Sequence, residues 1–202
     1  MTTTQRLAQG HNLAAWVEEQ VNELPLGNGS LRVRLPATCF IVAQEHHQAI
    51  LILLSQTHPV HASAFALVRP VYEAYLRGVW LARCATKENL ERFSKGESPP
   101  KMPVMLAAIE KTPEYGSGQL SDIYTRSWTA MCAYTHTGSE QVQRWNTSDA
   151  IQQDYPDADV EEVLTFTGAL VLLSTIGLAA IAENVGLAER VLSQAREFGY
   201  EF

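Results

Sequence analysis

A run of nineteen residues without a charged side chain, residues 164–182, constrains the fold more than any other feature of the chain. The run has about the length of a membrane-spanning helix, but a helix that is apolar on all sides can also lie inside a soluble bundle. It contains four hydroxyl side chains, its flanks are acidic, and no lysine, arginine or tryptophan anchors either end, which argues against a membrane span. We therefore expect a buried core helix, with a membrane-associated bundle as the alternative.

The rest of the chain has the pattern of further helices. Apolar residues recur at helical spacing over 13–24 and stop at a cluster of turn formers. Residues 31–35 alternate apolar side chains with arginines, and because no partner strand is visible we expect an extended linker there. Later helices are expected at about 36–58, 61–84, 104–111, 121–135 and 187–198, with polar connections at 87–103 and 140–159. The sequence predicts an all-α, antiparallel bundle of five to seven helices.

Length and composition narrow the class of protein. The 202 residues fit a single helical domain, with an N-terminal helix and linker in 1–35 and the core bundle in 36–202. The formal charge of −7 weighs against tight binding to duplex DNA, which requires a basic surface. The three cysteines lie far apart, and the N-terminus lacks the pattern of a signal peptide, so we expect a cytoplasmic protein.

One predicted helix carries an unusual row of charges. Arg69, Glu73 and Arg77 follow each other at intervals of four residues and therefore lie on one helical face, among large apolar side chains. Glu73 can accept hydrogen bonds from both guanidinium groups and orient them. The row keeps one net positive charge, which suits a phosphate or a carboxylate. The alternative is a structural ladder that ties this helix to a neighbour.

Two further residues of this helix affect its shape. Pro70 removes one backbone hydrogen bond, so it should kink or start the helix and leave a carbonyl free near the charged row. Gly78 has no side chain and would let another helix approach closely.

A second candidate segment reads Tyr-Thr-His at the end of the helix expected at 121–135. His136 would lie near a helix C-terminus, where it could act as a general acid or base. Alternatively, it only caps the free carbonyls of the helix. The other histidines lack partners at metal-ligand spacing, and we find no nucleophile elbow and no phosphate-binding glycine loop. The sequence therefore predicts neither a metal site nor a cofactor.

Two motifs carry a family resemblance: R-P-x-x-E-x-x-x-R-G-x-W at 69–80 and Y-T-H-x-G at 134–138. Together they resemble a bacterial family of all-helical proteins described only as a domain of unknown function. More distantly, a helix with Arg and Glu followed by a helix ending in His is similar to the HEPN superfamily. Many members of that superfamily are dimeric, metal-independent ribonucleases of toxin-antitoxin and phage-defence systems. The HEPN motif places an arginine four to six residues before its histidine, whereas here the nearest preceding arginine is Arg126, so the arginine would come from another helix.

These observations support one leading hypothesis and one alternative. The leading hypothesis is a HEPN-like ribonuclease or RNA-associated protein, in which His136, Arg69 and Arg77 are catalytic while Glu73 and Tyr134 bind or orient. RNA or a small anion would be the ligand, and a second copy or a cognate protein would be the partner. In the alternative, the same residues form a structural network or a small-anion site in a non-enzymatic binding or assembly module.

Overall fold

The computed structural model describes residues 2–26 and 29–200, and these residues form helices and connecting loops without a named strand. The elements are α1 (Thr3–Asn22), α2 (Leu31–Leu54), α3 (His61–Ala66), α4 (Val68–Arg83), α5 (Lys87–Ser94), α6 (Met102–Ile109), the 3₁₀ helix η1 (Pro113–Tyr115), α7 (Gln119–Thr135), α8 (Ser139–Gln143), α9 (Asp157–Ile181) and α10 (Val185–Glu197). The all-α prediction is confirmed. The described residues form more helices than the five to seven expected, because α5 and α8 lie in segments expected to be connections and the helix expected at 61–84 is divided in two.

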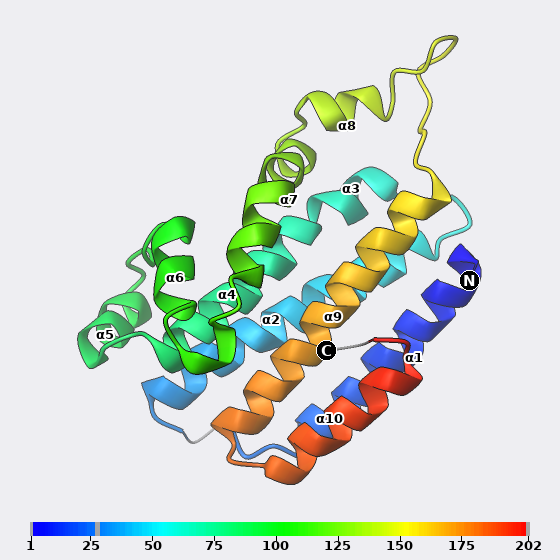
Figure 1. Cartoon of the computed structure of the whole chain (residues 1–202). Helices are drawn as coiled ribbons and strands as arrows, with labels where there is room; N and C mark the ends of the chain where they lie inside the picture. Colours follow the sequence, from blue (N-terminus) through cyan, green and yellow to red (C-terminus); the bar gives the residue numbers. More distant parts are fainter. Residues whose placement is uncertain (1, 27–28, 201–202) are drawn as a thin grey trace.

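Helix α9 runs through the middle of the molecule (Figure 1) and contacts α1, α2, α4 and α10. Helices α2 and α4 also pack against each other, α5 contacts α2, and α6 contacts α4 and α7. The uncharged run predicted from the sequence therefore lies inside the bundle. By length and composition α2 and α9 could each cross a membrane, which is weak evidence because a buried core helix has the same properties.

The hydroxyl groups of α9 explain how a moderately polar helix can occupy the core. Thr167 and Thr175 are fully buried, and each donates a hydrogen bond to the backbone carbonyl four residues earlier. Each threonine hydroxyl also forms a hydrogen bond with a side chain of α2. His47 Nδ1 lies 2.9 Å from the Thr167 hydroxyl, and the Gln44 amide donates to the Thr175 hydroxyl at 3.1 Å. These bonds satisfy the two threonine hydroxyls, whose burial would otherwise be penalised, whereas the buried hydroxyl of Ser174 has no partner among the described atoms.

Buried His47 makes stability depend on pH. Because the Thr167 hydroxyl already donates to a carbonyl, His47 Nδ1 carries the hydrogen of their bond, and Nε2 has no partner among the described atoms. Burial lowers the pKa of His47 from 6.5 to about 4. The unfolded chain therefore binds a proton first as the pH falls, so the stability contributed by neutral His47 is complete above pH 6.5 and is lost on going down through pH 4.

We expect acidification from pH 7 to pH 4 to remove roughly 3 kcal/mol through this one group. Urea unfolding measured across that range should show the loss in the wild type and a flatter profile in His47→Gln. The exposed His58 provides the control, since His58→Gln should keep the wild-type profile. Equal slopes for wild type and His47→Gln would contradict the assignment.

Residues 31–35 are not the expected linker, because α2 begins at Leu31 after Ser30 at the N-cap. The amides of Val33 and Arg34 both donate to the Ser30 carbonyl, and the Arg32 guanidinium reaches the Ala85 carbonyl at 2.8 Å. The alternation of apolar residues and arginines therefore reflects an exposed first helical turn and not an extended strand. The boundary expected at 35/36 falls inside this helix.

The expected effect of Pro70 is confirmed. The predicted helix at 61–84 is divided into α3 and α4 at Leu67, three residues before the proline. Proline has no N–H to bond the Ala66 carbonyl, and the Thr135 hydroxyl from the end of α7 lies 3.2 Å from that oxygen. The break thus gives α7 a point of attachment beside the start of α4.

The two ends of α7 agree only in part with the caps predicted from the sequence. Gly118, at a φ of +77°, precedes the helix in place of the expected Ser121 or Asp122 caps. Ser121 instead bonds Glu110, through its amide at 2.8 Å and through its hydroxyl at 2.6 Å. At the other end, the amide of Gly138 donates to the Ala133 carbonyl at 2.7 Å, and a side chain at Gly138 would collide with Ala133. The helix ends before Gly138 as predicted, but the residue in the left-handed conformation is Thr137, at a φ of +54°, and Gly138 has a φ of −74°.

Candidate functional site

The row on α4 forms an ion-pair ladder. Arg69 Nε donates to one carboxylate oxygen of Glu73 at 2.6 Å, and an Nη of Arg77 donates to the other oxygen. The three side chains are only partly exposed, with Glu73 the least accessible at 14%. Glu73 therefore fixes both guanidinium groups while leaving several of their N–H groups without a partner among the described residues.

His136 joins this ladder from another helix. Its backbone amide closes α7 on the Cys132 carbonyl, and its Nε2 lies 2.8 Å from Arg69 Nη1. A guanidinium can only donate, so Nε2 is the acceptor and the imidazole is neutral, with its hydrogen on Nδ1. The attachment of Thr135 to the Ala66 carbonyl holds the end of α7 close enough to α4 for this contact.

An open cleft of about 510 Å³ adjoins the ladder and is lined by Arg69, Glu73 and Arg77. Tyr124, Trp128 and Lys101 also line it, from α7 and from the segment before α6. Three cations face one carboxylate, so the cleft is locally basic although the chain has a net charge of −7. Anions would therefore be attracted to this part of the surface.

Aromatic side chains hold Arg69 at the cleft. The Arg69 Cζ atom lies 4.6 Å from the centre of the Trp128 ring, and the rings of Tyr124 and Trp128 are 4.9 Å apart. The guanidinium is thus restrained by Glu73, His136 and Trp128 together. Such a restrained cation loses little freedom on binding a ligand. Sequence reasoning missed Lys101, Tyr124 and Trp128. The spacing of four residues between the two aromatics on a predicted helix could have identified that pair, whereas nothing in the sequence marked Lys101.

Tyr134 does not join the cluster. Its hydroxyl accepts a hydrogen bond from Arg144 Nε at 3.3 Å, and its ring packs edge-on against Phe65. It therefore faces a different side of α7 from Trp128, although only two residues separate it from His136. Arg126, the arginine nearest before His136 in the sequence, pairs with Asp122 on its own helix. The arginine at His136 is Arg69, which comes from another helix.

Among residues 2–26 and 29–200, no group of three or more His, Cys, Asp or Glu side chains is arranged to hold a metal ion. The polar residues of the cleft are mostly donors, together with one carboxylate that already pairs with two arginines, and the rest of its lining is aromatic rings, prolines and methionines. The arrangement can hold an anion, bring a neutral imidazole next to it and offer ring surfaces to a flat group.

Comparison with known proteins adds one finding. A family described as of unknown function, DUF6988, matches residues 40–202, which include α4, α7 and the whole cleft. No curated protein and no solved structure matches the chain.

Proposed function

The chain belongs to the DUF6988 family, whose function is unknown, and we propose that it is a HEPN-like, metal-independent ribonuclease whose site is the Arg69–His136 pair beside the basic cleft. Arg69 lines that cleft, and His136 contacts Arg69 from outside the lining. The observation that carries this proposal is the 2.8 Å contact between Arg69 Nη1 and His136 Nε2 beside an open cleft. A guanidinium and a neutral imidazole at this separation can both reach one phosphodiester group and its neighbouring 2′-hydroxyl.

Each residue of the site has a separate role in the cleavage of RNA. When a phosphate oxygen takes the place of His136 as the acceptor of Arg69 Nη1, the lone pair of Nε2 becomes free. His136 then accepts the proton of the 2′-hydroxyl while the 2′-oxygen attacks phosphorus. The O2′–P bond forms, the P–O5′ bond breaks, and the leaving O5′ takes a proton from water. The hydroxide that remains takes the proton from His136 and restores the neutral imidazole. Glu73 keeps Arg69 oriented, and Arg69 and Arg77 stabilise the charge that develops on the phosphoryl oxygens.

The wider setting follows the same resemblance. We place the protein in the bacterial cytoplasm, within a toxin-antitoxin or phage-defence system, as a homodimer or with a cognate protein. Support for RNA as the ligand comes from the cleft, which combines three cations with the Tyr124–Trp128 pair. Cations along the backbone and rings for the bases are the features that single-stranded nucleic acids use.

A second candidate is a non-enzymatic module that binds a small anion. Two observations favour this candidate. Glu73 already accepts a hydrogen bond from each arginine, and Arg69 donates to His136 Nε2, the nitrogen that would have to accept a proton in catalysis. In this case the cluster would bind a phosphate or carboxylate group without cleaving a bond.

The experiment that separates the two candidates uses RNA and a chelator. The purified protein with EDTA should cleave an RNA oligonucleotide, leaving a 2′,3′-cyclic phosphate on one product and a 5′-hydroxyl on the other. The same oligonucleotide with 2′-deoxy sugars should bind and remain intact. Binding of both without cleavage would favour the anion-binding module. Cleavage only when a divalent metal is added would reject the proposed chemistry.

A further inference from the structure

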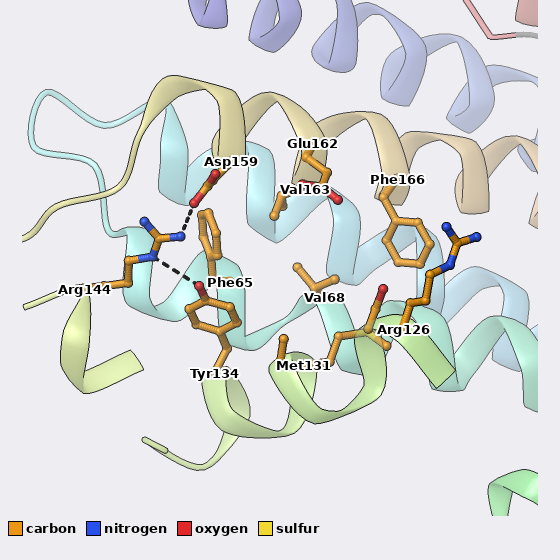
Figure 2. A pocket seen from close by; sticks show the side chains of 12 residues that line it. Phe65, Val68, Arg126, Met131, Tyr134, Arg144, Asp159, Glu162, Val163 and Phe166 are labelled. Atoms are coloured by element: carbon orange, nitrogen blue, oxygen red, sulfur yellow. Dashed lines mark hydrogen bonds and ion pairs between the residues drawn. The ribbon is translucent and has the colours of Figure 1, made fainter. Parts of the chain in front are cut away.

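A second pocket, of about 390 Å³, lies between α7 and α9, with α3 and α4 behind it (Figure 2). Its surface is mostly apolar, and the side chains that provide it are Phe65, Val68, Met131, Tyr134, Val163 and Phe166. None of the residues proposed for catalysis lines this pocket. Its size and its apolar walls are those of a small-molecule site.

Two arginines at the pocket are already neutralised. At one end, Arg144 pairs with Asp159 and donates to the Tyr134 hydroxyl (Figure 2). At the other end lies Arg126, which pairs with Asp122. Neither arginine therefore offers an uncompensated positive charge to a ligand.

Glu162 is the remaining charged residue of the lining, and it has no ion-pair partner among the described residues. It belongs to α9 and lies beside Val163, across the apolar middle of the pocket from Met131 (Figure 2). The four charged side chains of the lining sum to zero, but Glu162 is the one left without an ion-pair partner, and it is exposed beside the apolar and aromatic walls. An anionic ligand would meet the unpaired Glu162, whereas a cation would complement Glu162 and could contact the faces of the aromatic rings.

We propose that this pocket binds a small organic cation, an amine or quaternary ammonium group attached to an apolar body. The ammonium group would pair with Glu162, and the apolar body would fill the space between Phe65 and Phe166. The proposal does not depend on the function of the Arg69 cleft.

The test compares three ligands of the same length: hexylamine, hexanol and hexanoate. Titrations of the full chain, followed by calorimetry at neutral pH, should show hexylamine binding about threefold more tightly than hexanol, which corresponds to one ion pair with an exposed carboxylate. Hexanoate should bind more weakly than hexanol. Glu162→Gln should remove the preference for the amine while leaving hexanol binding unchanged.

Two control variants protect this interpretation. Glu161→Gln makes the same change in net charge one residue away, at a side chain that does not line the pocket, and should leave the preference for the amine intact. Ala130→Phe should fill the pocket and abolish binding of all three ligands, with circular dichroism used to verify that the variant is folded. Tighter binding of hexanoate than of hexylamine, or an equal loss of amine binding in both glutamate variants, would overturn the proposal.

Discussion

Replacing His136 with alanine is expected to lower RNA cleavage by a factor of about 10²–10⁴, the usual contribution of a general acid or base. The imidazole is exposed, and its one hydrogen bond among the described residues is to Arg69. The hydrogen bond that ends α7 is donated by the backbone amide of His136, so it is kept in the alanine variant. The variant should therefore unfold at nearly the wild-type urea concentration, with a change within about 1 kcal/mol. Single-turnover cleavage and urea unfolding measure the two quantities.

Substitutions at Arg69 should show whether cleavage depends on the positive charge alone or also on the shape of the guanidinium group. Arg69→Lys keeps the charge but cannot donate to Glu73 and a phosphate in the same plane, so we expect cleavage to fall by about 10²-fold or more while RNA binding changes little. Arg126→Ala is the matched control, because it removes an arginine of α7 that pairs with Asp122 and not with the cluster. Retention of full activity in both His136→Ala and Arg69→Lys would mean that the ladder is only structural.

The sequence could predict the ladder but not its partner. Residues four apart on a helix are neighbours whatever the rest of the chain does, so the contacts of Arg69, Glu73 and Arg77 follow from spacing alone. The approach of His136 depends on where α7 crosses α4, which is a tertiary property. The sequence contained one useful sign of that crossing: the carbonyl freed by Pro70 is the group that Thr135 contacts.

For Tyr134 the sequence predicted a contact that the structure does not contain. Its position two residues before His136 suggested a common site, but side chains two positions apart on a helix do not face each other. The structure accordingly places Tyr134 against Phe65 and Arg144. The error at residues 31–35 has a related cause, because a period of two over five residues is too short to distinguish a strand from an exposed helical turn.

The close packing of α2, α4 and α9 leads to the second large effect. The ring of Phe40 on α2 is buried and lies between Gly78 of α4 and Gly177 of α9. A Cβ atom on either glycine would lie 2.6 Å from a ring carbon of Phe40. The close approach expected at Gly78 is therefore made by an aromatic side chain. We expect Phe40→Ala to destabilise the protein by about 3–5 kcal/mol, because the three helices cannot collapse into the space without losing other contacts.

The glycines should show the complementary effect, since an added methyl group has no room beside the ring. Gly78→Ala is expected to cost about 1–3 kcal/mol in the wild-type background. In a Phe40→Leu background the smaller side chain leaves space for the methyl group, so the same substitution should cost at least about 1 kcal/mol less. Gly116→Ala is the control: the nearest atom to its added Cβ is 3.8 Å away, and its effect should stay within about 0.5 kcal/mol. Urea unfolding of the four proteins in the Phe40–Gly78 cycle measures the coupling directly. A cost of Gly78→Ala that is the same in both backgrounds would show that the ring does not limit the approach of α4 to α2.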